Sequence, residues 1–104
     1  MNCIVFCTNS YFIKYTKFML KQLNSFNNKY PVYVMVDNTV DEEHKNELLK
    51  YNIDIINIEP YKSIFNVYNK ENDSYPSIVL SKLMIPFIDE LKDYEKILYM
   101  DSDI

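Results

Sequence analysis

The residues best suited to chemistry stand near the end of the chain, where Asp101 and Asp103 are separated only by Ser102. Divalent cations such as Mn²⁺ and Mg²⁺ prefer oxygen ligands, and a cation that also binds phosphate typically takes only one or two carboxylates from the protein. The pair follows the apolar run 97–100, which is typical of a strand. The spacing therefore predicts a metal site for a phosphorylated ligand at a strand end, with a solvated turn as the alternative.

Composition limits the classes of partner. The 104 residues are 48% hydrophobic and 25% charged, which is typical of a folded, water-soluble domain. A net charge of −4 argues against a nucleic-acid surface, because such surfaces take most of their affinity from basic residues. An anionic phosphate ligand would then need a metal or a nearby lysine. No apolar stretch approaches the roughly 20 residues that span a bilayer. The short apolar run 3–7 has no basic region before it, so it is not expected to be a signal peptide.

The two cysteines indicate a reducing compartment. Cys3 and Cys7 lie four residues apart in a predicted strand, so their separation is about 13 Å, which is too far for a disulfide. We expect both to be buried thiols of a cytoplasmic protein.

Strand and helix patterns alternate along the chain. Apolar runs predict strands at 3–7, 31–36, 53–58 and 97–100. Helical spacing predicts helices over 12–26, from about 39 to 51, and from about 77 to 92, the last kinked at Pro86. The pattern Thr39-x-x-Glu42 resembles a capping box. Because the chain has no glycine, Asn27-Asn28 and Asn52 are expected to supply the left-handed residues that end the first two helices.

This order predicts an α/β fold with a Rossmann-like parallel sheet flanked by helices. With right-handed crossovers, such a sheet usually grows in one direction through its first three strands and then in the other, so that the fourth strand lies beside the first. This gives the strand order 3-2-1-4. Ligands bind such sheets at the carboxyl ends of the strands, where the order reverses. Thr8 and Asn9 are therefore expected to lie at the same edge as residues 101–103, with Asp101 within roughly 15 Å of Asn9, about three strand spacings.

Four segments together resemble glycosyltransferase family 8, the GT-A type that includes glycogenin and the lipooligosaccharide galactosyltransferases. They are Cys7-Thr8-Asn9, the ring at Phe12, Ser81-Lys82-Leu83 and Tyr99-Met100-Asp101-Ser102-Asp103-Ile104. The resemblance covers essentially the whole chain. It implies that residues 1–104 are the N-terminal nucleotide-sugar-binding part of a GT-A domain, truncated just after the Asp-x-Asp motif.

The resemblance implies retaining transfer of a hexose from a UDP-sugar, such as UDP-glucose or UDP-galactose, to a glycan or another acceptor. Mn²⁺ or Mg²⁺ would bridge the diphosphate, bound by Asp101 and Asp103. The implied nucleotide-sugar-binding residues are Thr8, Asn9, Phe12, Lys82, Asp101 and Ser102. Thr8 and Asn9 would face the uracil and ribose, Phe12 the base, and Lys82 the diphosphate and donor sugar; no residue is assigned as catalytic. Many relatives have tyrosine where this chain has Phe12, with Tyr11 adjacent.

Each assignment also has a structural alternative. Lys82 could be a solvated helix lysine, Asn9 a turn or helix cap, and Phe12 a core residue of the helix. His44, the only histidine, is interpreted as a surface or hydrophobic-staple residue and not as a base. Asp37-Asn38 is expected to form a turn at the end of the second strand.

Two other functional readings compete with the glycosyltransferase. Haloacid-dehalogenase-like phosphotransferases also place Asp-x-Asp after an apolar strand, but there the motif normally opens the domain and continues with Thr or Val, whereas Ile104 follows here. The chain could instead be a nucleotide-binding fragment without turnover. By itself it is expected to be inactive in transfer, because it offers no third metal ligand and no acceptor pocket. An exposed sheet edge is expected to allow self-association.

Overall fold

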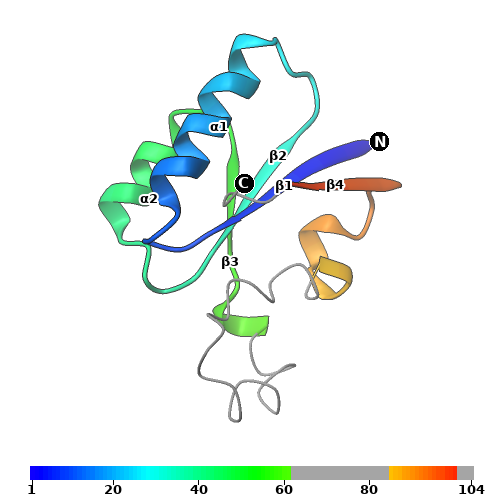
Figure 1. The fold of residues 1–104 in the computed structure, drawn as a ribbon. Helices are drawn as coiled ribbons and strands as arrows, with labels where there is room; N and C mark the ends of the chain where they lie inside the picture. The colour runs from blue at the N-terminus through cyan, green and yellow to red at the C-terminus, as the bar shows by residue number, and fades with distance from the viewer. Residues whose placement is uncertain (62–84, 101–104) are drawn as a thin grey trace.

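The fold is a four-stranded parallel sheet with helices packed on it, as seen in a computed structural model that describes residues 1–61 and 85–100 (Figure 1). Within them the sheet has the order β3-β2-β1-β4, with every neighbouring pair parallel. This confirms the predicted fold class and strand order. The elements are β1 (Asn2–Thr8), α1 (Ile13–Ser25), β2 (Val32–Val36), α2 (Glu42–Leu49), β3 (Asp54–Asn57), a 3₁₀ helix η3 (Asp89–Leu91) and β4 (Lys96–Met100).

The central strand β1 is buried because it has neighbours on both sides and side chains packed on both faces. Its residues from Cys3 to Thr8 are all buried, as the apolar run predicts. Thr8 pairs with Val36 of β2, and Phe6 pairs with Met100 of β4. The carboxyl ends of β1, β2 and β4 therefore lie at one edge of the sheet, called the carboxyl edge below.

The alternating side chains of the strands build one core on each face of the sheet. Ile4 and Phe6 point toward α1 and α2, where they join Leu20 and Leu48. Cys3, Val5 and Cys7 point the other way, into a core that includes Ile88 and Leu91. Figure 1 shows α1 and α2 side by side on one face and the short helical turns before β4 away from them. Both faces of β1 are thus removed from water, which is the main stabilising contribution here.

Asparagine supplies the left-handed backbone positions in this glycine-free chain. Asn27, just after α1, has φ of 54°, and Asn52, just after α2, has φ of 58°. They are the positive-φ residues of the described part of the chain. Asparagine tolerates this region better than most residues with a Cβ atom, so both predicted helix ends are confirmed.

The predicted capping box at Thr39 is wrong. The helix α2 begins at Glu42, and its N-cap is Asp41, whose carboxylate accepts a hydrogen bond from the His44 N–H. Aspartate is among the best N-cap residues, and here it stands directly before the first helical turn. The Thr39 hydroxyl is used elsewhere, in a contact described below.

The last predicted helix is also only partly correct. Its first part, 77–84, lies outside the described residues. Where the chain is described, residues 85–87 and η3 form 3₁₀ turns instead of a continuous α-helix. Pro86 lacks the N–H that an α-helix needs, and Ile88 between the two turns is extended, with ψ of 120°. Ile88 and Leu91 nevertheless reach the core, as amphipathic spacing requires.

A pair of tyrosines joins β2 to the segment that leads into β4. The hydroxyls of Tyr33 and Tyr94 are 2.8 Å apart, and their rings meet edge to face with centroids 5.8 Å apart. This hydrogen bond, together with burial, raises the pKa of Tyr33 above its ordinary value. The contact fixes the approach of the chain to the strand that precedes the Asp-x-Asp motif.

Both cysteines are buried and free, as predicted. Burial raises the pKa of the Cys3 thiol, so the uncharged form is favoured. The described part of the chain contains no helix long and apolar enough to cross a membrane.

Candidate functional site

The turn after β1 brings two of the predicted binding residues to the carboxyl edge. Thr8 is fully buried, and its hydroxyl donates to the Asn9 carbonyl oxygen at 3.1 Å. Asn9 is 8% exposed, and its side-chain oxygen Oδ1 accepts the Phe12 N–H at 3.0 Å. Asn9 therefore closes a turn before α1, which was its structural alternative. Among the described residues its amide Nδ2 has no hydrogen-bond partner, so it remains able to donate to a ligand.

Two aromatic rings follow that turn. Phe12 is the N-cap residue of α1 and is partly buried. Tyr11 is 76% exposed, and its ring packs edge to face on Phe12 with centroids 4.9 Å apart and planes at 84°. Phe12 thus lies in the predicted binding turn directly before α1, and its ring contacts the exposed ring of Tyr11.

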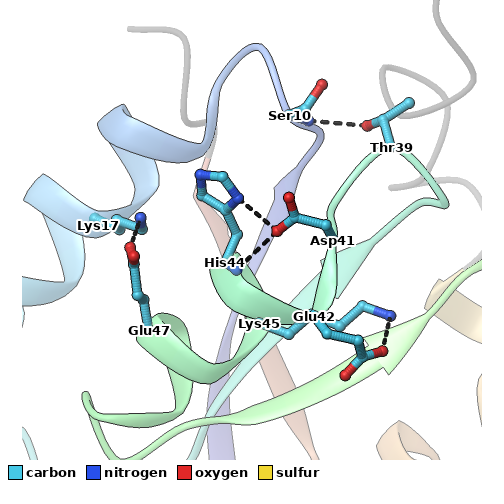
Figure 2. Close-up of polar contacts among 8 residues, drawn as sticks. All are labelled: Ser10, Lys17, Thr39, Asp41, Glu42, His44, Lys45 and Glu47. Carbon is cyan, nitrogen blue, oxygen red and sulfur yellow. Dashed lines mark hydrogen bonds and ion pairs between the residues drawn. The ribbon is translucent and has the colours of Figure 1, made fainter.

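The turn after β2 lies against the turn after β1. Asp37, which is 6% exposed, accepts two hydrogen bonds from Thr39 on its Oδ1, from the N–H at 3.0 Å and from the hydroxyl at 2.5 Å. The predicted turn at Asp37-Asn38 is therefore confirmed. The Thr39 hydroxyl oxygen in turn accepts the Ser10 N–H at 2.9 Å (Figure 2).

Sequence reasoning did not identify Thr39 and Asp37 as parts of this edge. Their contact with Ser10 joins residues 29 positions apart, so no local pattern could reveal it. The only available signal was a polar Asp-Asn-Thr segment at the end of an apolar strand, beside another strand end in the predicted sheet order.

His44 belongs to the beginning of α2, and its predicted surface position is confirmed. Its ring Nδ1 lies 2.6 Å from the Asp41 carboxylate, and both side chains are partly exposed (Figure 2). Hydrogen bonds from the His44 backbone and ring lower the pKa of Asp41. On the same helix, Glu47 forms an ion pair with Lys17 of α1. These contacts cap α2 and join the two helices.

The remaining predicted residues lie outside the described part of the chain. They are Lys82, Asp101, Ser102 and Asp103, and the structure gives no geometry for them. The described residues contain no cluster of three or more metal-ligating side chains. What the structure does show is the approach to the motif: β4 ends at Met100, beside Phe6 of β1, and Asp101 is the next residue in the sequence.

The fold and the strand ends define a Rossmann-like parallel α/β domain of the GT-A type. A family model described as glycosyl transferase family 8 matches residues 3–104, and the chain belongs to this family. No curated protein matches the chain. Membership supports glycosyltransferase activity in general, with a nucleotide-sugar donor and an acceptor, and it favours this class over the phosphotransferase alternative.

Proposed function

We propose that this chain binds the donor of a glycosyltransferase that moves a hexose from a UDP-sugar, UDP-glucose or UDP-galactose, to a glycan or another acceptor. The match to the family over residues 3–104 is the observation that carries this proposal. Thr8, Asn9 and Phe12 would contact the uridine, and Lys82, Asp101 and Ser102 the rest of the donor. The retaining stereochemistry is part of the same proposal.

The geometry of the sheet supports this assignment. β1 and β4 are parallel neighbours, and the register pairs Phe6 with Met100. Thr8 stands two residues beyond Phe6, and Asp101 one residue beyond Met100. The carboxyl ends of β1 and β4 are therefore neighbours, and the motif follows β4 directly in the sequence. A single nucleotide could then contact both strand ends, as in other sheets of this class.

The donor chemistry of the motif suits a divalent cation. Asp101 and Asp103 offer carboxylate oxygens, which Mn²⁺ and Mg²⁺ prefer, and two carboxylates leave room for phosphate oxygens. When bound, the cation would supply positive charge to the diphosphate leaving group. The need for such charge is supported by the composition, since the chain carries a net charge of −4.

Calorimetric titration of the chain with UDP tests the proposal. We expect heat of binding with Mn²⁺ and none with EDTA. Asp103→Asn should weaken UDP binding by about 1–3 kcal/mol or more, the scale of a lost contact to a charged group. Asp93→Asn is the matched control, because Asp93 is exposed and precedes β4, at the opposite end of this strand from the motif. Equal affinity in EDTA, or no binding under any condition, would contradict the proposal.

Two further parts of the proposal concern the whole chain. We propose a cytoplasmic location, which is supported by two buried free cysteines in the described residues. We also propose self-association through β4. Among the described strands β4 pairs with β1 alone, at the end of the sheet, and its Leu98 is 58% exposed.

A further inference from the structure

We infer that Thr39, held by the buried carboxylate of Asp37, is a positioning residue for the donor-binding turn 9–12. This inference rests on the proposed function, because it assigns to that turn a contact with the nucleotide. The observation behind it is a hydrogen-bonded link between the turns that follow β1 and β2, which the glycosyltransferase assignment does not itself require.

The link has a defined direction. The Ser10 N–H donates to the Thr39 hydroxyl oxygen, and the hydroxyl proton is donated to Asp37 Oδ1. A hydroxyl group can accept one hydrogen bond and donate another through the same oxygen atom. Asp37 Oδ1 also accepts the Thr39 N–H, which fixes the threonine backbone as well as its side chain. Asp37 therefore orients Thr39, and Thr39 in turn orients the backbone of Ser10.

The link acts on the residue next to the proposed ligand contact. Ser10 follows Asn9, whose Oδ1 already accepts the Phe12 N–H. Two hydrogen bonds thus hold the turn 9–12. One lies within the turn, from the Phe12 N–H to Asn9, and the other joins Ser10 to Thr39 in the turn after β2. With both present, the Asn9 amide, which has no partner for its Nδ2 among residues 1–61 and 85–100, and the Phe12 ring are held in place before a ligand arrives, which lowers the ordering cost of binding.

The same network continues to β3. The Asn38 N–H donates to the Glu59 carboxylate at 3.1 Å, and the Glu59 N–H donates to the Asn57 side chain at 3.0 Å. The turn after β2 is therefore itself anchored to its other neighbour. Because Asp37 is almost fully buried, its carboxylate has little freedom to release Thr39 to water.

The test compares three variants in the full chain. Thr39→Val keeps the shape but removes both hydrogen bonds of the hydroxyl, whereas Thr39→Ser keeps them. We expect Thr39→Val to weaken UDP binding in Mn²⁺ about threefold to tenfold, and Thr39→Ser to stay within about twofold of the unsubstituted chain. Asp37→Ala should act through the same link, so that adding it to Thr39→Val gives less than the product of the two separate effects.

Hydrogen exchange of the Ser10 amide supplies a readout that does not depend on the ligand. Exchange should accelerate in Thr39→Val and return to the original rate in Thr39→Ser, while amides in the centre of β1 keep their protection. Unchanged Ser10 exchange would overturn the inference whether or not UDP binds. Accelerated exchange with unchanged UDP affinity would also overturn it, because the link would then be purely structural. If the unsubstituted chain binds no UDP, the proposed function fails, and the claim on donor affinity fails with it.

Discussion

At the scale of single residues, the side chain of Asn9 has one atom that stabilises a turn and another that could bind a ligand. Its Oδ1 closes the turn before α1 by accepting the Phe12 N–H, while its Nδ2 is without a partner among the described residues. The structural and the functional interpretation of this residue are therefore compatible, because they use different atoms of one amide group.

This division of atoms can be tested with an isosteric change. Asn9→Asp keeps an oxygen that can accept the Phe12 N–H but replaces the donating NH₂ by a second acceptor. We expect the midpoint of urea unfolding to stay close to that of the unsubstituted chain, while UDP affinity in Mn²⁺ falls about fivefold or more. Asn9→Ala, which removes both atoms, should lower both quantities. Calorimetry that finds equal UDP affinity for Asn9→Asp would show that Nδ2 has no role in binding.

At the scale of elements, the strands could be predicted from the sequence, whereas the ends of the helices could be predicted only in part. Unbroken apolar runs identified β1 and β2, because strands packed on both faces exclude polar residues. The run 97–100 identified β4 as well, although its side chains are exposed or half-buried. The crossover rule then gave the order of the sheet. The beginning of α2 was mistaken, because Thr39 and Asp41 are both good caps and the choice depends on Ser10, which is distant in the sequence.

The true cap of α2 makes a prediction about acid stability. Hydrogen bonds from His44 lower the pKa of Asp41 below its ordinary value of 3.8. The stabilisation from this carboxylate is complete above the pKa of the unfolded chain and is lost as the pH falls through the lower folded pKa. Asp41→Asn should cap α2 nearly as well at neutral pH but give a shallower loss of stability in acid. Urea unfolding monitored by circular dichroism from neutral to acid pH measures the stability of both proteins. If the variant and the unsubstituted chain lose stability equally as the pH falls, the assignment of Asp41 is contradicted.

At the scale of the whole molecule, the sequence predicted where the candidate site should form but not how its parts are fixed. Parallel order alone brings the ends of β1 and β4 to one edge. The contact of Thr39 with Ser10 could not be predicted, because it depends on how two turns pack once the sheet exists. The Asp-x-Asp motif and Lys82 lie outside the described residues, so their roles stay predictions.

Self-association gives the prediction at this scale. If β4 pairs with a second copy, Leu98→Lys should shift the chain toward the monomer, because it places charge on an exposed edge strand. Leu49→Lys is the control, since Leu49 of α2 is 49% exposed but lies on no sheet edge. Sedimentation equilibrium over a range of concentrations measures the shift. A chain that is monomeric throughout, or an equal effect of both variants, would rule out this edge.

The contact between Tyr33 and Tyr94 gives the molecule an optical reporter of its own. The chain has no tryptophan, so its ten tyrosines dominate the near-ultraviolet absorption, and ionisation moves that absorption to longer wavelength. Tyr11, Tyr15 and Tyr30 are exposed to solvent, whereas the Tyr33 hydroxyl is hydrogen-bonded to Tyr94. Tyr33, with its raised pKa, favours the fold below the unfolded tyrosine pKa of about 10 and destabilises it as the pH rises further. After a jump to alkaline pH, the part of the tyrosinate signal that comes from Tyr33 is therefore expected to follow the separation of β2 from the segment that leads into β4, without any added label.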